Sequence, residues 1–231
     1  RVGSVEFGDW HDGRTVSAAS GTSLSVLAHK CQTQGLAGME WAVSVPGTVG
    51  GAVVNNAGAH GGDVAATLAD AVILDAERGA RLVACEDLQY GYRYSILKAR
   101  ADRRFLVLLA TFRLPADDPE AIKARMAEFV AYRKRTQPPG ASLGSIFKNP
   151  PGDYAGRLIE AAGLKGFTIG GAMVSPVHAN FFTSDASRNA TATDYYALIR
   201  HVRETVERYS GVQLELEIEL VGEHESPPQN V

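Results

Sequence analysis

The chain has 231 residues, of which 45% are apolar and 21% charged, a composition that supports a folded core and excludes disorder of the whole chain. The formal net charge of -3 gives no support for a general nucleic-acid binder. The longest apolar stretch, Phe105 to Ala110, is too short to cross a bilayer. Cys31 and Cys85 have no metal-ligand spacing and predict neither a metal site nor a disulfide framework. We therefore expect one large or two small domains in the cytoplasm, without membrane insertion.

The first half of the chain predicts strands and helices joined by glycine-rich loops. Residues 24–34 place Leu24, Leu27, Ala28 and Cys31 at helical spacing, and Gly35 is positioned to end that helix. The other elements expected here are strands at 15–19, 71–74 and 105–112, and an amphipathic helix at 120–135.

The second half predicts a separate α+β lobe, with a soft boundary near residues 115 to 140. The expected elements are helices at 155–162 and 193–209 and strands at 171–174, 180–183 and 214–221. In the last of these strands Glu215, Glu217 and Glu219 alternate with apolar residues, so they share one face. That face is either a solvated edge or the source of a carboxylate that reaches a cleft. Residues 223–231 are polar and are expected to form a flexible tail.

A glycine-dense run at residues 46–62 is the first candidate for chemistry. Glycine lets a ligand approach the backbone closely, and successive exposed N–H groups bind anions. The run therefore suits a pyrophosphate or a flat cofactor ring, although a purely structural turn is an equally good interpretation. It has neither the spacing of a phosphate-binding P-loop nor that of the Gly-x-Gly-x-x-Gly dinucleotide fingerprint.

Ser145 and Arg93 are candidate reacting groups. Ser145 lies in a Gly-Ser-Ile-Phe-Lys-Asn-Pro segment without a nucleophile elbow, so proton donation to a developing carbanion fits it better than hydrolysis. Arg93 is flanked by tyrosines and carries a fork that matches a carboxylate. From the local sequence alone, the simpler explanations are that Ser145 is an ordinary turn residue and that Arg93 forms a surface ion pair. His178 is, on the same grounds, a structural histidine.

Taken together, these segments resemble the UDP-N-acetylenolpyruvoylglucosamine reductase family in order and spacing from about Ala18 to Gly222. The motifs that carry the resemblance are Pro46-Gly47-Thr48-Val49-Gly50-Gly51-Ala52, Asn56-Ala57-Gly58-Ala59, Tyr92-Arg93-Tyr94-Ser95, Gly144 to Pro150, His178-Ala179-Asn180-Phe181 and Leu214 to Ile218. Only about 50 residues separate Arg93 from Ser145, which is similar to the family's second type, without an inserted tyrosine loop.

The resemblance implies an α+β chain with an incomplete FAD-binding lobe of the vanillyl-alcohol-oxidase type at residues 1–115 and a smaller substrate lobe at 116–222. It implies that NADPH reduces FAD and leaves. The flavin hydride then passes to UDP-N-acetylenolpyruvoylglucosamine, and the product is UDP-N-acetylmuramate for peptidoglycan synthesis. A monomer is expected.

The resemblance also implies roles for particular residues. Ser145 is the proton donor, and Arg93 and Glu217 polarise the enolpyruvyl carboxylate and stabilise an enolate-like intermediate, with Glu217 hydrogen-bonded or protonated. Lys148 and Asn149 contact the substrate. The flavin contacts expected in the glycine run are Pro46, Gly47, Thr48, Gly50, Gly51, Asn56 and Gly58.

Two departures from the family pattern leave other functions open. Leu216 stands where the family has proline, and no Gly-Gly-Gly-Ser-Asn turn for the FAD pyrophosphate is found, so an N-terminal subdomain is expected to be missing. The alternatives are a truncated nucleotide-sugar binding module and a flavin oxidase of the same fold. In an oxidase, His60 is a conceivable covalent attachment point for the flavin.

Overall fold

The computed structural model describes residues 3–10, 13–140, 142–184 and 189–222. The chain divides into two compact units, Arg1–Arg135 and Thr136–Val231. Each unit has a hydrophobic core of its own, so each is a domain in the physical sense. The predicted tail at 223–231 lies outside the described residues.

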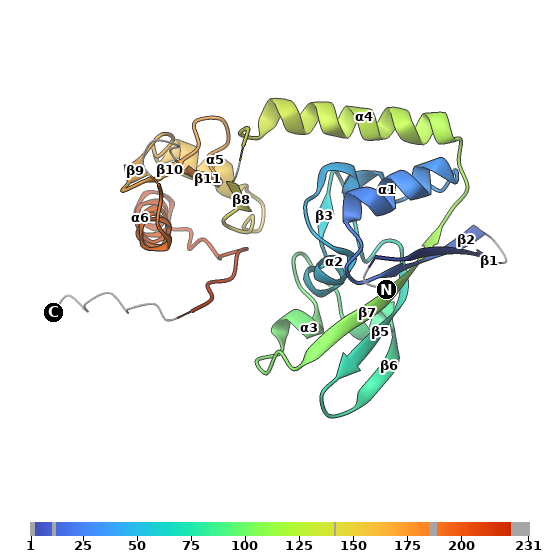
Figure 1. Cartoon of the computed structure of the whole chain (residues 1–231). Helices are drawn as coiled ribbons and strands as arrows, with labels where there is room; N and C mark the ends of the chain where they lie inside the picture. Colours follow the sequence, from blue (N-terminus) through green and yellow to red (C-terminus); the bar gives the residue numbers. More distant parts are fainter. Residues whose placement is uncertain (1–2, 11–12, 141, 185–188, 223–231) are drawn as a thin grey trace. The chain divides into compact units, whose positions relative to one another are not determined.

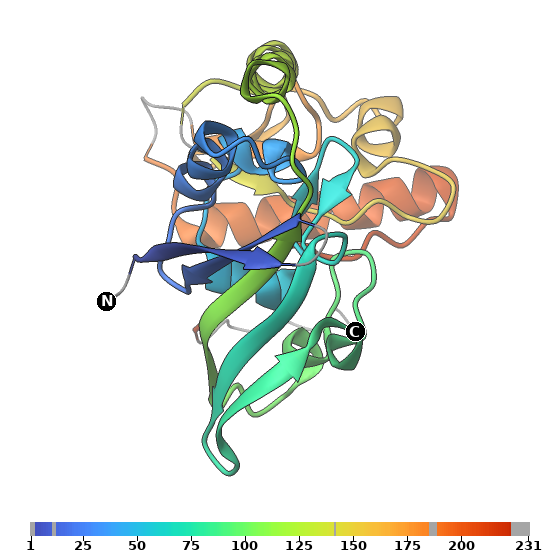
Figure 2. The ribbon, with the colours of Figure 1, turned by 90° about the vertical axis from the view of Figure 1, so that its right-hand side faces the viewer.

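The first unit is built on a five-stranded antiparallel sheet with the strand order β1-β2-β7-β5-β6. The strands are β1 (Val5–Trp10), β2 (Gly13–Ala19), β5 (Leu68–Asp75), β6 (Gly79–Ala84) and β7 (Phe105–Leu114). The sheet is strongly twisted, and β5 and β6 form a hairpin at its edge, with β5 alongside β7 (Figure 2). The predicted strands at 15–19, 71–74 and 105–112 lie within β2, β5 and β7.

Strand β7 is buried on one face and open on the other. A register shift in the pairing with β5, between Val107 and Leu109, changes which residues face inward. Val107 before the shift and Ala110, Phe112 and Leu114 after it lie in the core, whereas Leu106 and Leu108 are exposed. The strand is thus buried on one face only, because helices cover only one side of this sheet (Figure 1).

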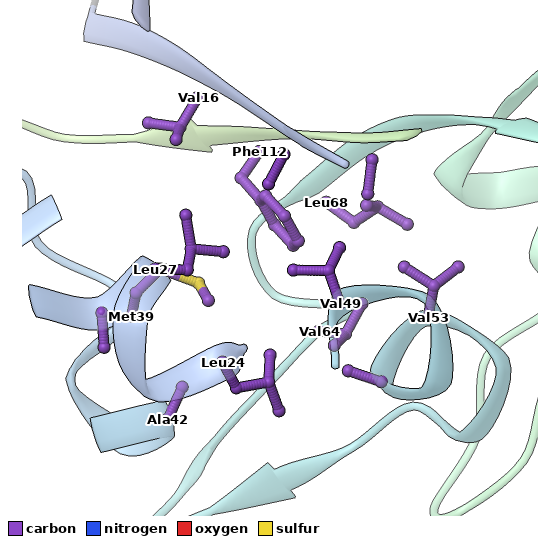
Figure 3. Close-up of a cluster of buried hydrophobic side chains, with 14 of the residues drawn as sticks. Val16, Leu24, Leu27, Met39, Ala42, Val49, Val53, Val64, Leu68 and Phe112 are labelled. Carbon is purple, nitrogen blue, oxygen red and sulfur yellow. The ribbon is translucent and has the colours of Figure 1, made fainter. Parts of the chain in front are cut away.

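The helices α1 (Leu24–Thr33) and α2 (Val49–Asn55) pack on the covered face of the sheet. Figure 3 shows Leu24 and Leu27 of α1, and Val49 and Val53 of α2, pointing toward Phe112. The buried residues of α1 are the four that the spacing predicts. Complete burial of a side chain such as Phe112 contributes about 1.5–3 kcal/mol, so this face stabilises the whole unit.

Helix α4 (Pro119–Thr136) belongs to the first unit, which corrects the predicted boundary at 115/116. Its residues Ile122 and Met126 are buried in the first core. The Arg125 guanidinium donates to Glu40, with a Nη2–Oε1 distance of 2.7 Å, and ties the helix to the segment before α2. Since these contacts hold α4 to the first core, the boundary falls at 135/136. The shorter elements of this unit are the hairpin of β3 (Gly58–Ala59) and β4 (Gly62–Asp63), the helix α3 (Ile96–Ala99), and the 3-10 helices η1 (Glu40–Ser44) and η2 (Cys85–Leu88).

The second unit has a four-stranded antiparallel sheet with the order β8-β11-β10-β9, packed with two helices. Its strands are β8 (Ser142–Ser145), β9 (Thr168–Ile169), β10 (Ala172–Val174) and β11 (Phe181–Ser184), and its helices are α5 (Ala155–Ala161) and α6 (Ala192–Ser210). The predicted helix at 193–209 lies within α6, which buries Leu198, Ile199, Val202 and Val206. Among the described residues, no helix is both long and apolar enough to span a membrane.

The strand expected at 214–221 is not formed. In its place the chain makes a single antiparallel bridge between Leu216 and Phe147. The apolar side chains Leu214, Leu216 and Ile218 still pack on the second core. The alternation of apolar and polar residues therefore reflects the burial of these side chains and not a continuous strand.

Candidate functional site

The glycine run of the first unit folds into helix α2 followed by the β3–β4 hairpin. The Thr48 hydroxyl accepts a hydrogen bond from the Gly51 N–H at 3.4 Å and caps the helix. Gly50 packs against Ser20, where a Cβ atom would lie only 2.2 Å from the Ser20 Oγ. The interpretation of this run as a plain turn missed α2, because two glycines in a seven-residue helix hide the helical pattern.

The residues predicted to bind the flavin divide into two groups. Pro46, Gly47, Thr48 and Gly51 are exposed, whereas Gly50 and Asn56 are buried and Gly58 is half-buried. Gly47 has a φ of +128°, and no heavy atom lies within 4 Å of the place where a Cβ would stand. Its backbone is therefore open to a ligand, and a side chain would fill that space.

The turn before Pro46 adds a second feature that suits a cofactor. Within the described part of the chain, Ser44 Oγ and Trp41 Nε1 are buried and have no hydrogen-bond partner. Unpaired buried donors are costly in a folded protein and are concentrated where a ligand or water completes the structure. The exposed backbone at 46–48 and these two donors together fit an FAD group in this segment.

Replacing Gly50 by alanine tests the packing of the glycine run. The added methyl group overlaps Ser20, so we expect the first unit to lose about 1–3 kcal/mol of unfolding free energy. Urea denaturation monitored by tryptophan fluorescence measures the change, since Trp10 and Trp41 both belong to this unit.

Gly51→Ala is the matched control, because its Cβ would lie at an ordinary contact distance of 3.7 Å from Thr48 Oγ1. An alanine at this helical position should stabilise by about 0.5–1 kcal/mol. Ser20→Ala should recover part of the loss in Gly50→Ala, and equal stability of the two glycine variants would contradict the packing argument.

Arg93 lies beside the glycine run in the first unit. Its Nη2 donates to the Gly58 carbonyl at 2.9 Å, and its guanidinium carbon lies 5.5 Å from the centre of the Tyr92 ring. The structure therefore brings together a predicted catalytic residue and a predicted cofactor-binding residue.

His60 is at the tip of the β3–β4 hairpin. Its ring stacks on Phe129 of α4 with centroids 4.4 Å apart. Burial, followed by the nearby Arg133, lowers the pKa of His60, so the ring is neutral at pH 7. The ring thus joins the hairpin to α4, a packing role that the sequence did not predict.

The second unit contains a cavity of about 410 Å³ beside the end of β8. The residues that line it come from β8, the loop after it, α5 and the turn before β11: Ser145, Asn149, Tyr154, Gly156, Arg157, Glu160, Val177, His178, Ala179 and Asn180. Two residues predicted from the sequence, Ser145 and Asn149, thus share one cavity. Of the others, His178, Ala179 and Asn180 belong to a motif that carries the family resemblance, and only His178 was given a role, a structural one.

Asn180 fixes the segment that follows Ser145. Its buried side chain accepts from the Phe147 N–H at 3.0 Å and donates to the Phe147 carbonyl at 2.8 Å. The backbone carbonyl of Asn180 also accepts from the Ile146 N–H at 2.9 Å. Since Ser145 is paired with Phe181 in the sheet, the backbone on its C-terminal side is held at several points.

His178 is held in one tautomer at the cavity wall. Its Nδ1 accepts from the Asn180 N–H at 3.2 Å, so a neutral ring carries its proton on Nε2. Burial is the main cause of a lowered pKa for His178, which favours that neutral form at pH 7. The histidine is therefore part of the cavity wall. It is also hydrogen-bonded to Asn180, whose side chain clamps the backbone of Phe147.

Lys148 and Asn149 have protein partners in this structure. Lys148 pairs with Glu215, and its N–H donates to the Glu215 carbonyl at 2.8 Å. The Asn149 Oδ1 accepts from the Ala155 N–H at 3.1 Å at the start of α5. Both residues thus order the rim of the second unit, and their contact with substrate stays a prediction.

Glu217 lies next to the Ser145 segment through its backbone. Its N–H donates to the Ile146 carbonyl at 2.8 Å, beside the bridge between Phe147 and Leu216. Of the three alternating glutamates, Glu215 forms the ion pair with Lys148, and Glu217 is half-buried. Arg93 belongs to the other unit, so its convergence with Ser145 and Glu217 stays a prediction.

Comparison with known proteins agrees with this arrangement. Residues 136–221 match the family model of the UDP-N-acetylenolpyruvoylglucosamine reductase C-terminal domain, and residues 7–77 match that of an FAD binding domain. The UDP-N-acetylenolpyruvoylglucosamine reductase of Synechococcus sp. (strain RCC307) is 47% identical over 90% of this chain and 67% of its own length. That of Chloroflexus aggregans is 45% identical over 87% of this chain and 68% of its own length.

A solved structure is similar as well. The crystal structure of UDP-N-acetylenolpyruvylglucosamine reductase from Thermus caldophilus aligns with a TM-score of 0.77 and 37% identity, covering 88% of this chain and 71% of that one. The fold, the open glycine turn and these matches define an oxidoreductase with an FAD-binding lobe.

More narrowly, the chain belongs to the UDP-N-acetylenolpyruvoylglucosamine reductase family. The resemblance and the α+β fold class predicted from the sequence are thereby confirmed.

Proposed function

We propose that this chain reduces UDP-N-acetylenolpyruvoylglucosamine to UDP-N-acetylmuramate with NADPH as the source of reducing equivalents. The observation that carries the proposal is the cavity of about 410 Å³ in the second unit, which Ser145 and Asn149 share. It lies in the part of the chain that matches the reductase C-terminal domain. We further propose that the chain acts as a monomer in the cytoplasm.

FAD would be held by the exposed backbone of the Pro46–Thr48 turn, with Gly51 and Gly58 nearby. When bound, a flavin supplies hydride transfer between the two substrates. The protein's contribution is to bind and orient the reactants and to exclude competing reactions. Buried Gly50 and Asn56 support this surface from inside the unit.

The Ser145 hydroxyl is the proposed proton donor to the enolpyruvyl carbon next to the carboxylate. A positioned donor of this kind accelerates proton transfer by roughly 10²–10⁴-fold. The rigidity of the 145–147 segment supports this role, because Asn180 holds the backbone immediately after Ser145.

Arg93 and Glu217 are proposed to stabilise the enolate-like charge that develops on the substrate carboxylate. A guanidinium offers a planar fork for two carboxylate oxygens. Glu217 contributes only when it is protonated or hydrogen-bonded, since a bare carboxylate would repel this charge. Lys148 and Asn149 are proposed to contact the rest of the substrate.

A flavin assay tests the proposal. The protein is purified, incubated with FAD and mixed anaerobically with NADPH, and the absorbance near 450 nm is followed. We expect the absorbance to bleach with NADPH and to recover when UDP-N-acetylenolpyruvoylglucosamine is added.

Other results would separate the alternatives. Binding of the sugar nucleotide without flavin absorbance would indicate a nucleotide-sugar binding module. Recovery of the flavin absorbance only on addition of oxygen, with consumption of O₂, would indicate an oxidase. Either result would overturn the proposed reaction.

A further inference from the structure

We propose that Asn56 and Ser95 are positioning residues that hold the loop carrying Arg93 against the glycine run. The inference rests on the proposed function for the role of Arg93, but the anchoring itself is independent of it. It also changes the expectation for Asn56, from a residue that touches the flavin to one that acts through the Arg93 loop.

The Arg93 loop is a tight turn with a disfavoured backbone conformation at its tip. Gly91 and Tyr94 exchange two backbone hydrogen bonds of 3.1 Å each, and Tyr92 and Arg93 lie between them. Arg93 has a φ of +54°, in the left-handed region where a side chain is disfavoured. A residue persists in such a conformation when the surrounding structure holds it there.

Asn56 supplies the first anchor. It ends α2, is only 4% exposed and has its own left-handed φ of 45°. Its side-chain amide donates to the Gly91 carbonyl at 2.9 Å and to Asp63 Oδ2 at 3.4 Å, while its Oδ1 accepts from the Ala65 N–H at 3.0 Å. The buried amide therefore joins α2, the β4 segment and the Arg93 loop, and it is occupied by protein groups.

Ser95 supplies the second anchor, on the other side of the loop. Its side chain is fully buried, donates to the Val54 carbonyl at 2.5 Å and accepts from the Lys98 N–H at 3.0 Å. Tyr90, just before the turn, donates in the same way to the Val53 carbonyl at 2.8 Å. Carbonyls at the end of α2, which have no partner within a helix, are thus satisfied by side chains on both sides of the Arg93 turn.

The consequence of this anchoring is a fixed place for the Arg93 guanidinium. Its Nη2 bonds to the Gly58 carbonyl, in the segment that Asn56 also holds. Bidentate recognition of a carboxylate depends on tight positioning, and a displacement of about 1 Å costs on the order of 10²-fold in rate.

Limited trypsin digestion tests the anchoring directly, because trypsin cleaves after Arg93. In Asn56→Asp, the donor to the Gly91 carbonyl becomes an acceptor while the overall shape is kept. In Ser95→Ala, the bonds to Val54 and Lys98 are lost. We expect cleavage of the Arg93–Tyr94 bond, followed by mass spectrometry, to be roughly tenfold faster in each variant than in the wild type.

Asn55→Asp is the matched control, because the same chemical change is made one residue earlier. The Asn55 amide donates to the Gly51 carbonyl of its own helix at 2.9 Å, a bond that does not involve the Arg93 loop, so cleavage at Arg93 should stay at the wild-type rate. Circular dichroism verifies that all variants are folded. Unchanged cleavage at Arg93 in both folded test variants would overturn the proposal.

Kinetics then distinguish positioning from cofactor contact. We expect Asn56→Asp to lower kcat roughly tenfold or more with little change in FAD affinity, and to have little further effect when Arg93 is already alanine. Weaker FAD binding with normal cleavage at Arg93, or fully additive effects with Arg93→Ala, would overturn the proposal. If the wild type bound FAD but did not reduce the substrate, the proposed function would fail, and the digestion would then decide the anchoring by itself.

Discussion

Ser145→Ala is expected to slow product formation by roughly 10²–10⁴-fold while leaving the reduction of bound FAD by NADPH unchanged. The serine hydroxyl lines the cavity of the second unit and is the proposed source of the proton that the substrate receives. Reduction of the flavin by NADPH needs no proton from this group, so only the second half of the reaction should respond. Anaerobic stopped-flow absorbance separates the two halves.

Ser142→Ala is the control for this experiment. Ser142 lies on the same strand, but it is exposed and does not line the cavity, so both halves of the reaction should keep their wild-type rates. An equal loss of rate in both halves for Ser145→Ala would show that the residue supports folding or flavin binding and would argue against proton donation.

The second large effect is expected from Asn180→Leu, which should destabilise the second unit by about 2–6 kcal/mol. The Asn180 amide satisfies both the N–H and the carbonyl of buried Phe147, and each buried group left unpaired costs about 1–3 kcal/mol. Thermal and urea unfolding followed by circular dichroism measure the loss. Proton donation by Ser145 should weaken as well, because the adjacent backbone loses its clamp.

Thr183→Val is the matched control, because Thr183 lies on β11, the strand that begins directly after Asn180. Among the described residues, Thr183 has a buried hydroxyl without a hydrogen-bond partner, so replacing it by a methyl group removes no bond. We expect this variant to be as stable as the wild type or more stable. If Thr183→Val and Asn180→Leu lost similar stability, the hydrogen bonds from Asn180 to Phe147 would not be the cause of the loss.

The regular elements were largely predictable because their patterns are local. The spacing of Leu24, Leu27, Ala28 and Cys31 predicted α1 together with its buried face. The helix at 193–209, which lies within α6, was predicted in the same way. Failures occurred where the local pattern was weak or ambiguous: glycines masked α2, and the alternation of residues 214–221 reflected packing on the second core without a strand.

The candidate site was predicted only in part, for a related reason. Motif spacing identified Ser145 and Asn149, and the structure places both on one cavity. The clamp by Asn180 was not found, since an asparagine in a chain of 231 residues carries no signal for which backbone groups it will meet. The same holds for Asn56, which was expected to contact the flavin and is engaged by Gly91, Ala65 and Asp63.

By itself the sequence determined the family, the α+β class and the identity of the candidate reacting groups, because these depend on residue type and spacing along the chain. The tertiary structure decided that α4 joins the first unit, that Lys148 pairs with Glu215, and that Asn56 and Ser95 hold the Arg93 loop. These features arise from contacts between residues 35 to 85 positions apart in the chain. Hydrogen bonds and ion pairs over such separations are set by how the cores pack, which no local pattern encodes.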